Sequence, residues 1–80
     1  MRYSLDTHKG FYRKRRGSGF SYTDETGTVI KDKNILLRIK QLVIPPAWKN
    51  VWISPYENGH LQVTGTDLKG RKQYRYHPDW

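Results

Sequence analysis

The sequence predicts an α+β domain: a small, mainly antiparallel β-sheet of about five strands with one or two short helices. Three observations lead to this fold class. The chain has 80 residues, which is enough for one small domain. Several short segments alternate between apolar and polar side chains and are separated by glycine-containing turns. One segment instead places its apolar residues three and four positions apart, as an amphipathic helix does.

The first predicted element is a β-hairpin over residues 20–30. Phe20 and Tyr22 lie two apart and therefore share one face of its first strand. Residues 24–27 read Asp-Glu-Thr-Gly, which combines acidic residues that start turns with a glycine that accepts positive φ. Residues 28–30 are then expected to return as the second strand.

One amphipathic helix of about three turns is predicted between Asp32 and Pro45. Asp32 has a side chain that is preferred at a helix N-cap. Pro45 and Pro46 end the helix, because neither offers an N–H and the first disfavours helical geometry in Ile44. The apolar residues at helical spacing are Ile35, Leu36, Ile39, Leu42 and Val43.

Three more strands are predicted in the second half of the chain. Residues 51–54 form the first of them, and Asn58-Gly59 supplies a turn into a return strand over residues 60–64. A loop over residues 65–70, with glycine at both ends, leads into a basic and aromatic strand over residues 71–76.

The composition excludes several classes of protein. Fifteen Lys and Arg stand against seven Asp and Glu, giving a net charge of +8, which excludes an acidic disordered tail. Aromatic residues make up 14% of the chain, too many for a disordered polybasic arm. The chain has no cysteine, so a disulfide scaffold and a thiolate metal site are both excluded. We expect no membrane partner, because no apolar run approaches the length of a membrane span.

The strongest candidate for a binding site is the segment from Lys69 to Tyr76, where cations are interleaved with tyrosines. Cations neutralise phosphates, Gln73 can pair with adenine, and a two-stranded ribbon fits the DNA major groove. On a regular strand the segment forms two rows, with Lys72, Tyr74 and Tyr76 on one face and Arg71, Gln73 and Arg75 on the other. Both rows can reach one ligand if the strand enters the groove edge-on or bulges near Gln73. The alternative is a solvated edge strand whose charges prevent aggregation.

Two further features have open interpretations. The run Arg13-Lys14-Arg15-Arg16 could bind phosphate, act as a targeting signal, or be a solvated run of charge. The tryptophans at 48, 52 and 80 could stack on bases or belong to the core.

The sequence offers no complete catalytic set. His8, His60 and His77 lack the spacing of metal ligands, and the acidic pair Asp24-Glu25 is explained by the turn. No glycine-rich phosphate loop follows a strand and opens a helix. We therefore expect no cofactor, no metal and no catalysis by this chain alone.

A series of motifs recurs in order along the chain. It comprises Ile44-Pro45-Pro46-Ala47-Trp48, Val51-Trp52-Ile53, Asn58-Gly59-His60-Leu61-Gln62, Thr64-Gly65-Thr66-Asp67 and the run 70–78. The basic run followed by residues 19–22, Gly27 and residues 30–32 precedes them. Together these motifs resemble the N-terminal domain of bacterial type IB DNA topoisomerases, relatives of the poxvirus topoisomerase. The likeness covers nearly the whole chain.

The resemblance implies a parent enzyme that relaxes supercoiled DNA without ATP or an obligatory metal. In this family a tyrosine of a larger C-terminal domain, absent from this chain, forms a 3′-phosphotyrosyl link. The N-terminal domain closes over the major-groove side of the DNA as half of a clamp. The resemblance implies DNA contacts, and no nucleophilic role, for Arg71, Gln73, Tyr74 and Tyr76. At position 75 an arginine stands where the poxvirus relative has an aromatic residue.

We therefore expect residues 1–80 to form one N-terminal DNA-binding domain with a basic arm over residues 1–16. The expected partners are double-stranded DNA and the catalytic domain of the same protein, and we expect a monomer on the nucleoid in the bacterial cytoplasm. An RNA or single-strand binding module and a basic docking domain for a protein remain alternatives. With about six phosphates neutralised, log K should fall against log salt with a slope near −5. The candidate nucleic-acid-binding residues are Lys69, Arg71, Lys72, Gln73, Tyr74, Arg75, Tyr76, His77, Arg13 and Arg15.

Overall fold

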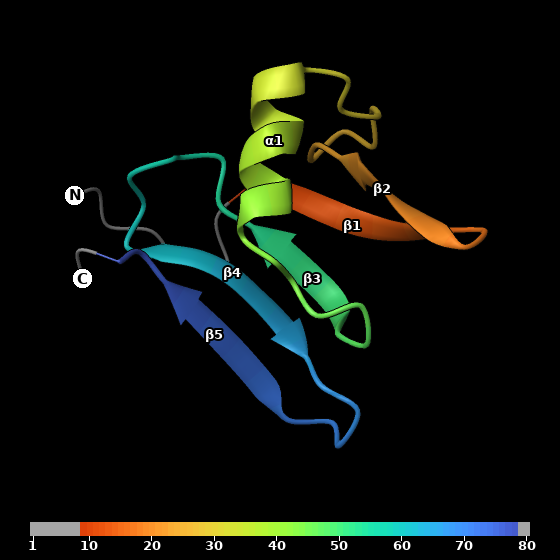
Figure 1. The fold of residues 1–80 in the computed structure, drawn as a ribbon, viewed down its shortest axis with the longest axis vertical. Helices are drawn as coiled ribbons and strands as arrows, with labels where there is room; N and C mark the ends of the chain where they lie inside the picture. Colours follow the sequence, from red (N-terminus) through yellow and green to blue (C-terminus); the bar gives the residue numbers. More distant parts are fainter. Residues whose placement is uncertain (1–8, 79–80) are drawn as a thin grey trace.

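The computed structural model describes residues 9–78, in which one helix lies across one face of a five-stranded sheet (Figure 1). The elements in chain order are β1 (Phe11–Arg16), β2 (Gly19–Thr23), α1 (Lys33–Gln41), β3 (Lys49–Ile53), β4 (Leu61–Thr66) and β5 (Lys72–Tyr76). The strands are arranged β2-β1-β3-β4-β5, and every neighbouring pair is antiparallel. This architecture confirms the predicted α+β fold.

Helix α1 begins at the predicted residue. One carboxylate oxygen of Asp32 accepts the N–H groups of Asn34 and Ile35, at 2.8 and 3.3 Å, and so satisfies two donors of the first turn. At the other end the helix stops at Leu42, and Val43 follows with a φ of 51°. A β-branched residue rarely adopts this left-handed conformation, so the chain is strained where it leaves the helix.

The core lies between α1 and the sheet. Ile39 from the helix, Val51 and Ile53 from β3, and Val63 from β4 are all at most 2% exposed. Burial of an aliphatic side chain of this size contributes about 1.5–3 kcal/mol. The partly buried residues packed around this cluster are Phe11, Tyr22, Ile35, Leu42, Ile44 and Trp48.

Two of the three tryptophans are packed into the fold, and Trp80 lies outside the described residues. Trp52 is 3% exposed and alternates with Val51 and Ile53, so it points to the opposite face of the sheet. Trp48 packs on Gly65 of β4, where an added Cβ would lie 2.7 Å from the ring. The core interpretation of these two tryptophans is therefore confirmed.

The N-terminal hairpin is formed by other residues than predicted. Instead of a hairpin over residues 20–30, β2 pairs with β1 from Thr23 opposite Tyr12 to Gly19 opposite Arg16. The predicted turn at Asp24 does form and brings residues 28–30 back beside β2, through the bridge between Thr23 and Val29 and a hydrogen bond from Ile30 N to Tyr22 O at 2.7 Å. This return is short because β2 pairs along its whole length with the basic run, which the sequence did not place in the hairpin. Residues 1–8 of the predicted arm lie outside the described residues.

Candidate nucleic-acid interface

The segment that carries the predicted contacts is an edge strand. β5 pairs with β4, and among residues 9–78 no strand pairs with its other edge. Side chains alternate along the strand, so both of its rows flank one accessible edge. The edge position allows side chains of both rows to reach one ligand, as the sequence analysis requires for a single site.

The row on the sheet face opposite α1 consists of Lys72, Tyr74 and Tyr76. The two tyrosine rings are nearly parallel, with centroids 6.4 Å apart and planes inclined by 17°. Lys72 Nζ lies 5.6 Å from the centroid of the Tyr74 ring, a cation–π distance. Tyr74 and Tyr76 are 49% and 47% exposed. The two phenols are therefore surface groups and not part of the core.

On the α1 side of the strand, Arg75 is engaged within the protein. Its Nη1 donates to the carbonyl oxygens of Leu42 and Val43, at 3.2 Å for the latter. Its guanidinium carbon also lies 5.9 Å from the centroid of the Trp48 ring. Helix C-termini carry unsatisfied carbonyls and partial negative charge, so this arginine stabilises the end of α1. The sequence makes Arg75 a candidate DNA contact, and the structure places its guanidinium against the helix end.

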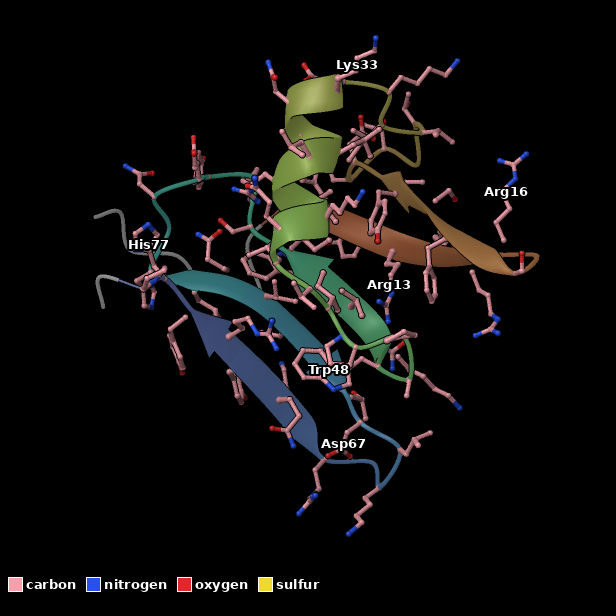
Figure 2. All side chains as sticks on the ribbon, in the orientation of Figure 1. Arg13, Arg16, Lys33, Trp48, Asp67 and His77 are labelled. Carbon is pink, nitrogen blue, oxygen red and sulfur yellow. The ribbon has the colours of Figure 1, made fainter. Side chains whose placement is uncertain are left out.

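The other two members of that row, Arg71 and Gln73, both donate to Asp67. Figure 2 shows Asp67 at the turn between β4 and β5. Asp67 Oδ2 accepts from Arg71 Nε at 3.3 Å and from Gln73 Nε2 at 2.9 Å. Asp67 Oδ1 accepts the backbone N–H groups of Lys69 and Arg71, both at 2.9 Å. Donation from Arg71 N and then from Gln73 holds the pKa of the Asp67 carboxyl below its usual value.

Asp67 was not among the predicted site residues, because its place in the loop between Gly65 and Gly70 indicates only a turn. A signal was present, because Arg71 and Gln73 follow the carboxylate at positions four and six further along the chain. Across a tight turn into an antiparallel strand, this spacing brings both side chains back over the turn residue.

The second basic cluster lies on β1, three strand positions from β5. At the usual spacing between strands this separation is about 14 Å. Arg13 Nη2 donates to the carbonyls of Pro45 and Trp48, at 3.0 and 2.7 Å, and its guanidinium lies 4.2 Å from the Phe20 ring centroid. Burial lowers the pKa of Arg13 from its usual value. Arg13 thus holds the loop after α1, whereas Arg15 beside it is exposed.

The remaining predicted residues lie at the two ends of β5. Lys69 is exposed in the turn next to Asp67, and His77 follows the last strand residue at the other end (Figure 2). The backbone N–H of His77 donates to the carbonyl of His60 at 2.7 Å and so continues the pairing of β5. The predicted set is therefore brought together along β5, and only Arg13 and Arg15 lie apart from it.

Comparison with known proteins decides the family. Residues 19–67 match the family model of the N-terminal domain of bacterial DNA topoisomerase IB. The chain belongs to this family. This confirms the resemblance that the motifs of the sequence carry, and it makes the chain an N-terminal domain of the type IB topoisomerases.

A curated relative supports the same assignment. The chain is 46% identical over 69 residues to DNA topoisomerase 1B of Acanthamoeba polyphaga mimivirus. The match covers 85% of this chain and 20% of the viral protein, so the chain spans about a fifth of that relative's length. No solved structure matches. Within residues 9–78, no helix is long and apolar enough to cross a membrane.

Proposed function

We propose that this domain binds duplex DNA along the outer edge of β5, with the strand lying in the major groove. The observation that carries the proposal is the placement of two side-chain rows on one edge strand, with the two tyrosines exposed. A β-ribbon fits the major groove, where base pairs present distinct patterns of donors and acceptors. An edge-on entry sets one row against each wall of the groove.

The side chains along β5 have different roles in this proposal, according to their chemistry. Lys69, Arg71 and Lys72 are exposed beside the open edge and neutralise phosphates. The tyrosine hydroxyls bond phosphates or base edges, and their rings contact thymine methyl groups. Arg75 and Arg13 support the site without contacting DNA, since their guanidinium groups bond the end of the helix and the loop that follows it.

Within the whole enzyme, we propose that this domain is the major-groove half of a clamp around DNA. The parent protein relaxes supercoils through a 3′-phosphotyrosyl intermediate that is formed in its C-terminal domain. The present chain holds and orients the duplex, and it does not cleave DNA by itself. It acts as a monomer in the bacterial cytoplasm, on nucleoid DNA.

Competition binding tests this proposal. The fluorescence anisotropy of a short labelled DNA duplex bound to the domain is measured while unlabelled duplex DNA or single-stranded RNA of equal length is added. Duplex DNA should displace the probe at a lower concentration than the RNA does. A preference for the RNA would make the domain a single-strand module. Relaxation of supercoiled plasmid by the chain alone would refute its non-catalytic role.

A further inference from the structure

Asp67 is an acidic residue directly before the basic segment 69–76, and its two oxygens accept different kinds of donor. Oδ1 accepts two backbone N–H groups, those of Lys69 and Arg71, and closes the turn. Oδ2 accepts two side-chain donors, Gln73 Nε2 and Arg71 Nε. Turn closure alone needs only one acceptor oxygen, which Asn or Ser also supplies. The second oxygen is what a carboxylate adds at this position, because it accepts the two side chains of the β5 segment.

Asp24 provides an internal comparison. Its Oδ1 accepts the backbone N–H groups of Thr26 and Thr28, at 2.9 and 3.1 Å, which are the residues two and four further along the chain. Asp67 makes the same two backbone bonds to residues two and four further along. The two carboxylates thus form equivalent turns, and Asp67 alone of the two also holds side chains of β5.

The bond to Gln73 fixes the orientation of its amide. A carboxylate only accepts hydrogen bonds, so the NH₂ end of the amide must face Asp67. One N–H is used there, and a second N–H and Oε1 remain. In the major groove, this second N–H can donate to adenine N7, and Oε1 can accept from the adenine N6 amino group. Without the carboxylate, the amide could flip and the donor and acceptor would exchange places.

Arg71 is restrained from one side only. Its Nε bonds Asp67, while its side chain is 66% exposed. An arginine has four further N–H donors on its two Nη atoms, which are the ones that bind phosphate or guanine. Restraint at Nε therefore orients the guanidinium without occupying its outer donors.

We propose that Asp67 is a positioning residue that sets the base reading of Gln73, making the domain sensitive to adenine in its duplex. This inference rests on the proposed binding of duplex DNA by β5. Asp67 itself contacts no base in this scheme. Its role is to hold the Gln73 amide in one of two orientations, with Arg71 fixed beside it.

The test compares Asp67→Asn with the matched control Asp24→Asn. Both substitutions remove one negative charge and leave one acceptor oxygen for the turn, but Asp67→Asn loses the acceptor for Gln73. Affinity is measured for a short adenine-containing duplex and for the same duplex with 7-deazaadenine, which lacks the N7 acceptor. The unmodified protein and Asp24→Asn should lose about tenfold in affinity on this exchange. Asp67→Asn and Gln73→Ala should lose less than twofold.

A second measurement needs no DNA. In ¹⁵N NMR spectra of the 80-residue chain, the Gln73 side-chain amide should be rigid and shifted in the unmodified protein and in Asp24→Asn. In Asp67→Asn, the resonance of this amide should move to the chemical shift of a mobile, solvent-exposed glutamine. If Asp67→Asn unfolds, Asp67→Ser replaces it, and unfolding of both would assign Asp67 to the fold and refute the positioning role.

The outcomes separate this inference from the function on which it rests. Failure of the unmodified protein to bind any duplex would refute the proposed function. Binding with an equal 7-deazaadenine effect in Asp67→Asn and Asp24→Asn would leave the proposed function standing and overturn the role of Asp67.

Discussion

Removal of a positive charge should have different consequences at the two basic positions of β5, Lys72 and Arg75. Lys72 is exposed on the sheet face opposite α1, while Arg75 donates to two carbonyls at the end of α1. We predict that Lys72→Gln weakens DNA binding and leaves stability unchanged. Arg75→Gln should lower stability and leave the salt dependence of binding unchanged.

The magnitudes follow from these contacts. Each neutralised phosphate contributes about 0.9 to the slope of log K against log salt, so Lys72→Gln should make that slope shallower by about 0.9. Hydrogen bonds from a charged donor contribute about 1.5–3 kcal/mol, and the partial exposure of Arg75 reduces this to about 1–2 kcal/mol. In a domain of this size, that loss lowers Tm by about 4–15 °C.

Two assays separate the positions. Thermal unfolding followed by circular dichroism gives Tm, and anisotropy titrations with a labelled duplex at several salt concentrations give the slope. For the unmodified domain, the three exposed cations beside the β5 edge give a slope of about −3. This is shallower than the −5 expected from the sequence, because Arg13 and Arg75 are held within the protein and the exposed Arg15 lies on β1, three strand positions from β5. The reasoning is refuted if Arg75→Gln flattens the slope as much as Lys72→Gln and leaves Tm unchanged.

Three further predictions concern the strand and its supports. The double substitution Tyr74→Ala and Tyr76→Ala should weaken duplex binding at least tenfold, measured by anisotropy, without lowering Tm; a collapse of the fold would make both tyrosines core residues. Val43→Gly should raise the free energy of unfolding in urea by about 0.5–1 kcal/mol, because glycine accepts positive φ without strain; a loss of stability would contradict this. The pKa of Asp67 is lowered by folding, so its contribution to stability is present above the unfolded pKa and is lost as pH falls through the folded pKa. In acid titrations, the free energy of unfolding of Asp67→Asn should therefore depend less on pH than that of the unmodified protein. An equal loss of stability in acid for both proteins would contradict a lowered pKa for Asp67.

The elements with strong local signals could be predicted from the sequence. The start of helix α1 is marked by Asp32, which agrees with the structure, whereas the helix ends at Gln41, earlier than the end at Pro45 that the sequence predicted. β5 alternates between rows of different chemistry, so its two faces were predicted correctly. Strand β1 has weak local signals, since four of its six residues are basic and give no apolar alternation. Its pairing with β2 depends on tertiary structure.

The contacts of Arg13, Arg75 and Asp67 could not be predicted from the sequence for a related reason. A basic residue in a sequence is expected to point into solvent, and nothing local indicates that Arg13 and Arg75 reach carbonyls more than thirty residues away. Those acceptors belong to the segment after α1, whose path becomes clear only when the helix is placed on the sheet. Asp67 was missed because its backbone role in the turn conceals its side-chain role.

Chemical-shift mapping with a short DNA duplex tests the central claim most directly. The amide and side-chain resonances of the 80-residue chain are followed as unlabelled duplex is added. Shifts concentrated at residues 69–77, with the two phenol rings among the strongest, are the predicted result. Shifts spread evenly over all lysines and arginines, or centred on the β1–β2 hairpin, would contradict binding of duplex DNA by the edge of β5.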